Sequence, residues 1–160
     1  MDQQQQETQR PSSTVCIPVL VGPLVKTRQE KPCSIYFEIT FLEERGQAAA
    51  AAPMPLSGIV FRNFYCSHIS VKQKQPSGGG GLGGQGQGEE WATVLHDRPL
   101  MENPHYEGDA QDWHVLRAVE FDSDTYDPRS RSPLRVHLHQ ASPVWAAMEL
   151  RHVKCVSCPP

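Results

Sequence analysis

The feature that most constrains this chain is a set of short segments in which apolar and polar residues alternate. Residues 34–42 place four large apolar side chains on one side of a two-residue repeat: Ile35, Phe37, Ile39 and Phe41. Residues 134–139 repeat the pattern with Leu134, Val136 and Leu138. Successive side chains of a strand point to opposite faces, so each segment predicts a strand with one buried face. No long apolar stripe with the helical period of 3.6 occurs.

Other strand-like segments extend this pattern along the chain. The apolar stretch 15–25 is interrupted by Pro18 and Gly22, which suits a bent or edge strand because proline cannot donate a hydrogen bond to a sheet. The remaining predicted strands span 59–61, 69–71, 91–95, 113–121 and 144–156. About seven strands with almost no helix predict an all-β fold, an antiparallel β-sandwich.

Length and composition predict a single domain. A chain of 160 residues is near the usual size of one domain. Residues 1–13 are polar and Gln-rich, which predicts a disordered lead. Residues 76–88 contain eight glycines and predict a flexible loop, because glycine offers no side chain to pack. We therefore expect one β-sandwich over 14–158, with 76–88 as a long insertion.

Charge and hydropathy exclude several classes of protein. The net charge is −3, so no global field attracts nucleic acid or an anionic membrane. Residues 102–127 alone carry eight acidic side chains and one basic side chain. No apolar run approaches the length of a membrane span, and the first residues do not resemble a secretion signal. Five cysteines without such a signal predict reduced thiols in an intracellular protein.

Two motifs are candidates for metal binding. Cys155 and Cys158 form a CxxC pair that His137, His139 or His152 could complete as a zinc site if their strands were adjacent. The spacing does not require this, so we expect incidental thiols, solvent-facing imidazoles and no bound metal. The acidic segment 122–127 offers carboxylates for calcium but lacks the glycine and distal glutamate of an EF-hand, which favours a solvated loop.

The sequence does not predict a catalytic site. The Gly-x-Ser-x-Gly pattern of a nucleophile elbow is absent, and the glycine tract lacks the Gly-Lys-Ser/Thr ending of a phosphate-binding loop. We therefore expect no enzymatic activity and no cofactor. Of the three tryptophans, Trp91 is expected in the core because Ala92 and Val94 follow it on the same predicted strand.

Several segments, in this order, resemble the nicolin family. The most specific are the Phe-Arg-Asn-Phe-Tyr strand and the Gln-x-Ser-Pro-x-Trp corner. The matching segments are 58–65, 69–73, 91–95, 100–101, 103–105 and 134–145. The strand order also looks like the jelly-roll sandwich of galactose-binding-like domains, which is an analogy of fold alone. The glycine tract looks like an expanded family loop and the chain stops soon after the last strand, so we expect a short or divergent form.

The resemblance implies a non-catalytic scaffold or adaptor subunit of the tubulin polyglutamylase complex. Its implied partners are the other subunits, including a tubulin-tyrosine-ligase-like enzyme that adds glutamates to tubulin tails. The acidic segment 102–127 should repel those acidic tails, so contact with tubulin is expected to be indirect. The implied location is cytoplasmic, on microtubules, the cytoskeleton or the cilium, with the nucleus as a second location. Neither nucleic acid nor membrane is expected as a partner.

Two alternatives remain open from the sequence. One is a structural protein of microtubules or the axoneme, and the other is a lectin-like domain that binds carbohydrate or calcium. Under the adaptor hypothesis, the contact surface should be the polar set that alternates with apolar positions on the best-matched strands. The candidate partner-binding residues are Arg62, Lys72, Arg135, His137 and His139.

Overall fold

A computed structural model describes residues 14–27, 35–42, 54–76 and 89–158. The predicted lead 1–13 and nearly all of the glycine tract 76–88 lie outside these residues. Apart from one short 3-10 helix, all regular secondary structure of the described residues is strand, so the predicted all-β sandwich is confirmed. The elements are β1 (Val15–Ile17), β2 (Val19–Val21), β3 (Val25–Lys26), β4 (Ile35–Phe41), β5 (Gly58–Phe64), β6 (His68–Lys74), β7 (Trp91–Pro99), β8 (Trp113–Arg117), the 3-10 helix η1 (Ala118–Glu120), β9 (Leu134–His139) and β10 (Glu149–Ser157).

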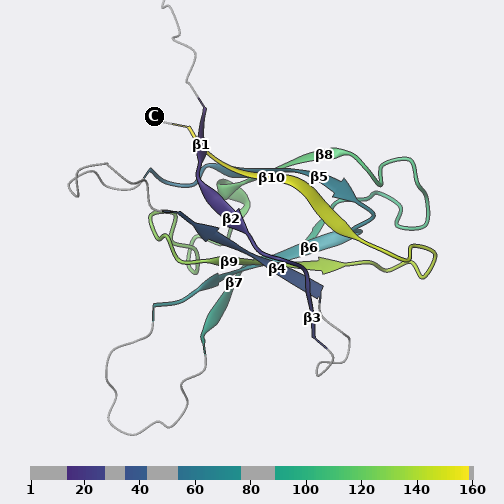
Figure 1. Cartoon of the computed structure of the whole chain (residues 1–160), viewed down its shortest axis with the longest axis horizontal. Coiled ribbons are helices and arrows are strands. Elements are labelled where there is room, and N and C mark those ends of the chain that lie inside the picture. Colours follow the sequence, from purple (N-terminus) through teal and green to yellow (C-terminus); the bar gives the residue numbers. More distant parts are fainter. Residues whose placement is uncertain (1–13, 28–34, 43–53, 77–88, 159–160) are drawn as a thin grey trace, which may run out of the picture.

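The strands form two antiparallel sheets that pack face to face (Figure 1). The four-stranded sheet has the order β1-β10-β5-β8, and the six-stranded sheet has the order β2-β4-β9-β6-β7, with β3 also paired to β4. Alternate residues of the regular strands, most clearly in β9, point between the sheets, as the two-residue repeats predict. The most completely buried apolar side chains are Phe61, Ile39, Ile69, Leu134, Leu138, Val71 and Val94.

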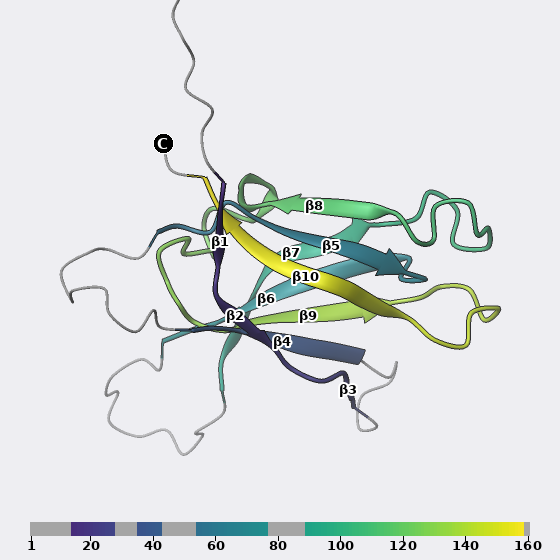
Figure 2. The same ribbon diagram turned by 45° about the horizontal axis from the view of Figure 1, so that its top comes forward.

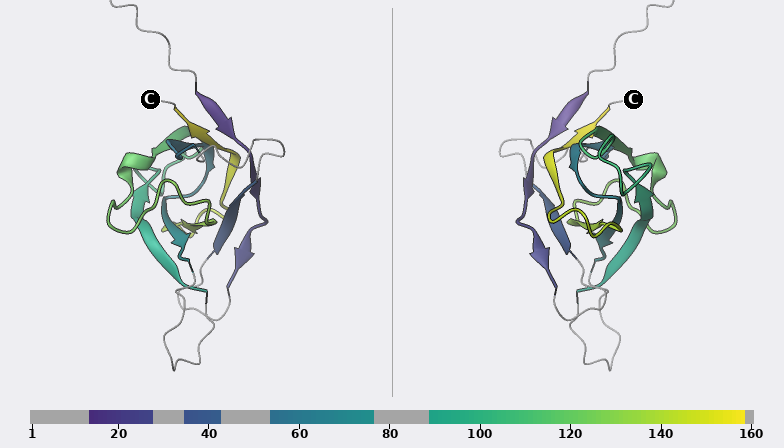
Figure 3. Two further views of the ribbon diagram at one scale, coloured as in Figure 1. Left: turned by 90° about the vertical axis from the view of Figure 1, so that its left-hand side faces the viewer. Right: turned by 90° about the vertical axis from the view of Figure 1, so that its right-hand side faces the viewer.

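The first described segment belongs to both sheets. β1 pairs with β10 in the four-stranded sheet, and β2 pairs with β4 in the six-stranded sheet. Pro18 lies between them, and the peptide bond it forms offers no N–H to either ladder. End-on views show this segment running along one side of the sandwich from one layer to the other (Figure 3). The predicted interruption at Pro18 is therefore where the chain changes sheets.

Three sequence predictions differ from the structure. The segment 113–121 is strand only to Arg117 and then forms η1, and the segment 144–156 becomes strand only at Glu149. Trp91 does not lie in the core. It pairs with Lys74, whose side chain alternates with the buried Gln73, and it is half-buried on the outer face of the six-stranded sheet. Val94 is buried and lies three residues from Trp91, so regular alternation already places these two side chains on opposite faces of β7.

Long loops gather at one end of the sandwich. Residues 100–112 and 140–148 project there side by side (Figure 2), and hydrogen bonds connect them.

Within the residues described above, no helix is long and apolar enough to span a membrane.

Candidate functional site

The outer face of the six-stranded sheet gathers four of the seven histidines of the chain. Since β6 and β9 direct Ile69, Val71, Val136 and Leu138 inward, the residues between them point outward. Antiparallel pairing then places histidines and serine on neighbouring positions of the two strands. We call this surface the histidine face, and its members are His68, Ser70, His96, Asp97, His137 and His139.

A β-bulge aims Asp97 at this face. β6 advances two residues from Ile69 to Val71, while β7 passes three residues from Arg98 to Leu95, so β7 carries one extra residue opposite Ser70. Asp97 has a φ of 46°, in the left-handed region that few non-glycine residues other than Asn and Asp occupy. Bulges re-aim side chains, and backbone strain concentrates at functional positions. The bulge therefore marks this part of the histidine face as a candidate site.

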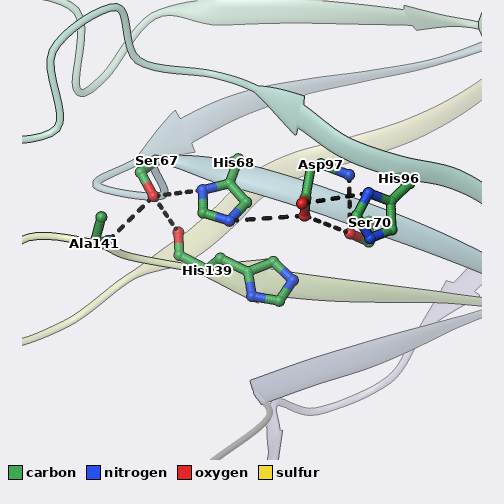
Figure 4. Close-up of polar contacts among 7 residues, drawn as sticks. All are labelled: Ser67, His68, Ser70, His96, Asp97, His139 and Ala141. Atoms are coloured by element: carbon green, nitrogen blue, oxygen red, sulfur yellow. Dashed lines mark hydrogen bonds and ion pairs between the residues drawn. The ribbon is translucent and has the colours of Figure 1, made fainter. Parts of the chain in front are cut away.

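Two buried serines hold the ionisable groups in place (Figure 4). The hydroxyl of Ser70 donates to Asp97 Oδ1 at 3.3 Å and accepts the Asp97 backbone N–H at 3.1 Å. The hydroxyl of Ser67 donates to the His139 carbonyl at 2.9 Å and lies 2.9 Å from His68 Nδ1. It also accepts the Ala141 backbone N–H. These hydrogen bonds orient the side chains of Asp97 and His68, whereas Ser67 contacts only the backbone carbonyl of His139.

Two imidazoles and one carboxylate converge beside the bulge. The rings of His68 and His139 stack with centroids 4.7 Å apart and an interplanar angle of 6°. His68 Nε2 lies 3.8 Å from Asp97 Oδ1, and one donor atom from each of the three residues lies within 4.8 Å of the others. Burial, and next the neighbouring His68, lower the pKa of His139, so its imidazole stays neutral over a wider pH range.

A cationic group sandwiched by aromatic rings continues the surface along β9. The guanidinium of Arg135 lies 4.4 Å from the centre of the Tyr36 ring and 4.0 Å from that of Trp91. It also pairs with Glu38 Oε1 at 2.7 Å, and its side chain is only 19% exposed. Planar guanidinium groups favour this combination of stacking and ion pairing.

His137 lies between Arg135 and His139 on β9. Its ring is 5.3 Å from that of Tyr36. Burial, with the cations Lys72 and Arg135 as further causes, lowers the pKa of His137 to about 4. His137 is therefore neutral at physiological pH and adds a polar but uncharged group to the surface.

The structure brings four of the five predicted partner-binding residues together. Lys72, Arg135, His137 and His139 all lie on β6 and β9, on the outside of the six-stranded sheet. Arg62 lies on β5 in the other sheet, where it pairs in register with Arg151 and Trp113. The sequence pattern showed that each residue alternates with apolar neighbours, but not which sheet its strand would join.

The CxxC pair and the neighbouring histidines do not form one donor set. Cys155 is buried, whereas Cys158 is exposed at the end of β10 in the four-stranded sheet. His137 and His139 lie on the outer face of the other sheet. In the acidic segment, Asp122 and Asp127 accept backbone N–H groups of nearby residues, which is turn capping. Among the described residues there is a single cluster of three side chains that could ligate one metal ion, and it consists of His68, Asp97 and His139.

Sequence reasoning missed His68 and Asp97. His68 immediately precedes one predicted strand, and Asp97 lies two residues beyond another, so neither forms a local motif with His139. The one local signal is the sequence His96-Asp97, which follows an apolar run and precedes Arg98 and Pro99. Only the pairing of β6 with both β7 and β9 makes these residues neighbours.

Three segments behind the nicolin resemblance meet at the loop end of the sandwich. The ring of Tyr65 packs on that of Trp145 with centroids 4.5 Å apart, and the Gln140 amide donates to the Tyr65 carbonyl. The Trp145 indole N–H donates to the Pro104 carbonyl at 2.7 Å, and His105 Nδ1 lies 2.9 Å from the Ser142 hydroxyl. These segments therefore lock one corner of the fold together.

An apolar cleft of about 340 Å³ lies beside this corner. It runs between β3 and the segment that precedes β10, and Trp145 and Met148 form part of its wall. Two of the apolar side chains that line it, Leu24 and Val25, remain exposed. Grouped exposed apolar side chains are typical of surfaces that bind other proteins.

The fold and these surfaces define an all-β sandwich protein that carries a polar, histidine-rich sheet face and an apolar cleft. No family model matches the chain. Its sequence is 28% identical to mouse Nicolin-1 over 130 residues, which cover 81% of this chain and 54% of Nicolin-1. The chain is thus a divergent, nicolin-like protein that spans about half the length of this curated relative.

A solved structure shares the fold without close sequence similarity. A chain in the X-ray crystal structure of reduced XRCC1 bound to the DNA pol beta catalytic domain matches with a TM-score of 0.54 at 11% identity. The match covers 79% of this chain and 74% of that one. At this identity the likeness concerns the sandwich fold alone.

Proposed function

We propose that this chain is a non-catalytic adaptor subunit of the tubulin polyglutamylase complex and acts by binding other subunits. The observation that carries the proposal is the similarity to Nicolin-1 over four-fifths of the chain. In this role the protein contacts a tubulin-tyrosine-ligase-like enzyme or its companion subunits, and its contact with tubulin is indirect. The expected location is the microtubule cytoskeleton.

Two structural features support binding to proteins. The cleft beside Trp145 has exposed apolar side chains at its rim, as a docking surface requires. The corner that closes it is fixed by ring packing and hydrogen bonds, so a partner would bind a preformed surface with little ordering cost. The negative segment 102–127 opposes direct binding of acidic tubulin tails.

The test is co-purification of complex subunits with tagged protein from cells. Single charge reversals separate the two sheet faces: Lys72→Glu alters the outer face of the six-stranded sheet, and Arg62→Glu alters that of the four-stranded sheet. Leu24→Asp alters the rim of the cleft. We expect Leu24→Asp to reduce recovery of the ligase subunit, because a carboxylate at an apolar contact must be desolvated.

Each variant must first melt cooperatively, as the wild-type chain should. Loss of the ligase with only one variant assigns the contact to that surface. If the wild-type chain recovers no polyglutamylase subunit, the adaptor proposal is wrong. Sedimentation of the purified chain with microtubules in the absence of other subunits would instead support a structural microtubule protein.

A further inference from the structure

We propose that His68, Asp97 and His139 bind a divalent transition-metal ion of the zinc class through two imidazoles and one carboxylate. The three residues come from three different strands, β6, β7 and β9, and meet on the histidine face (Figure 4). The proposal is independent of the adaptor function and concerns a different surface from the cleft.

The hydrogen bonds of Ser67 determine which nitrogen of His68 is free. The single hydroxyl proton of Ser67 is donated to the His139 carbonyl, so Ser67 Oγ can only accept from His68 Nδ1. Nδ1 therefore carries the proton, and in the neutral imidazole Nε2 presents its lone pair. This is how metal-binding histidines are usually held, with the second nitrogen donating to a fixed acceptor.

That lone pair faces a carboxylate. His68 Nε2 lies 3.8 Å from Asp97 Oδ1, which Ser70 holds in place through a hydrogen bond. A lone pair and an anionic oxygen repel each other unless a positive charge lies between them. When His68 is protonated, the Nε2 proton supplies that charge and the contact is an ion pair; in the neutral imidazole a metal cation can supply it. The nearly parallel His139 ring then adds a second nitrogen donor beside it.

The distances fit a site that closes on its ion. The three donor atoms lie within 4.8 Å of one another. Two ligands about 2.1 Å from a tetrahedral zinc ion are about 3.4 Å apart, so ring rotations that move the donor atoms by roughly an ångström complete the geometry. Two imidazoles with one carboxylate favour zinc or cobalt over magnesium or calcium, which prefer oxygen ligands.

The position of the site indicates an incomplete coordination shell. The side chains of His68 and Asp97 are 32% and 54% exposed, so a fourth position is open to solvent. His96 Nδ1 lies 3.3 Å from Asp97 Oδ2 and orients the carboxylate from its other side. With three protein ligands, the fourth ligand is water or a donor atom from another molecule.

The first experiment measures metal-dependent stability of the full chain. Protein stripped with EDTA and desalted is melted with zinc chloride, magnesium chloride or no metal at about 100 µM, since a ligand that binds the native state raises the melting temperature. We expect zinc to raise the melting temperature and magnesium to leave it unchanged. No rise with zinc would overturn the proposal.

Substitutions then locate the ion. His68→Gln, His139→Gln and Asp97→Asn should each weaken zinc binding, measured by titration calorimetry, at least tenfold. Asp97→Asn is the most conservative of these because asparagine tolerates the left-handed conformation and keeps the size of the side chain. A cobalt complex of the wild-type chain should show a visible absorption band that Asp97→Asn removes.

A matched control removes potential donor atoms that lie outside this cluster. The double variant His152→Asn, Cys158→Ser eliminates groups near the CxxC pair and should bind zinc as the wild type does. If zinc binding is lost in this control but retained in Asp97→Asn, the ion binds elsewhere and the proposal fails. Every variant should also melt cooperatively in EDTA, which shows that a loss of zinc affinity does not result from unfolding of the variant.

Discussion

Trp145 packs its indole ring on the phenol ring of Tyr65, with centroids 4.5 Å apart, although 80 residues separate them in sequence. Each belongs to a segment that carries the nicolin resemblance. Tyr65 ends the Phe-Arg-Asn-Phe-Tyr segment and directly follows β5, and Trp145 ends the Gln-x-Ser-Pro-x-Trp corner. Contacts between the two segments stabilise the loop end of the sandwich, beside the apolar cleft.

Replacing Trp145 with alanine should lower the free energy of unfolding by about 2–4 kcal/mol, because the variant loses a large ring contact and an indole hydrogen bond. The matched control is Trp113→Ala. Trp113 is 59% exposed and contacts the ring of His152, so its loss should cost less than about 1 kcal/mol. Chemical denaturation measures both, and equal costs would contradict the structural role of the corner.

Leu138→Ala should cost about 2–4 kcal/mol, since Leu138 is 2% exposed and lies in the core between the sheets. Val119→Ala serves as the surface control, because Val119 is 87% exposed and its truncation should change stability by no more than about 0.5 kcal/mol. A cost below about 1 kcal/mol for Leu138 would mean that β9 presents its other face to the core.

Arg135→Lys should destabilise the protein by roughly 1–2 kcal/mol despite keeping the charge. Lysine cannot stack its head group between Tyr36 and Trp91 while it pairs with Glu38, as the guanidinium does. The tryptophan fluorescence spectrum should shift as well, because the Trp91 ring loses its contact with the guanidinium group and becomes more exposed to solvent. Lys72→Arg provides the control on the neighbouring strand, and a similar effect there would argue against a specific role of Arg135.

Stability should fall as the pH drops below about 6.5, and His114 should contribute to this fall. Burial lowers the pKa of His114 in the folded state, and its Nε2 makes no hydrogen bond among the described residues. The unfolded chain therefore binds the proton more readily, so stability is complete above the unfolded pKa and is lost as pH falls. His114→Phe, which preserves stacking on Phe61, should flatten the pH dependence measured by denaturation at pH 8 and pH 5.

The described cysteines should differ sharply in reactivity. Burial raises the pKa of Cys66 and of Cys155 to about 12, whereas Cys16 and Cys158 are exposed. In a Cys33→Ser background, a thiol reagent should modify two thiols quickly in native protein and all four only after unfolding. Fast modification of four native thiols would show that β10 does not bury Cys155.

Local pattern alone predicted the strands whose two faces differ most. Residues 35–41 and 134–139 alternate cleanly, and each forms one strand with the expected buried face. The prediction failed where local geometry departs from that period. The bulge opposite Ser70 turns Asp97 onto the outer face of the six-stranded sheet, and the turn residues 144–148 are apolar without being strand. A bulge depends on pairing with a partner strand, so it leaves little trace in a single segment.

The sequence by itself determined that the chain forms strands and that these strands bury one face each, because propensity and alternation act between near neighbours. The order of its matching segments also carried the resemblance to nicolin. Only the tertiary structure decided which strands share a sheet. That choice placed Arg62 on one outer face and Arg135 on the other, and it brought His68, Asp97 and His139 from three strands into one cluster. Strand order is set by the burial of all strands together, so no short segment encodes it.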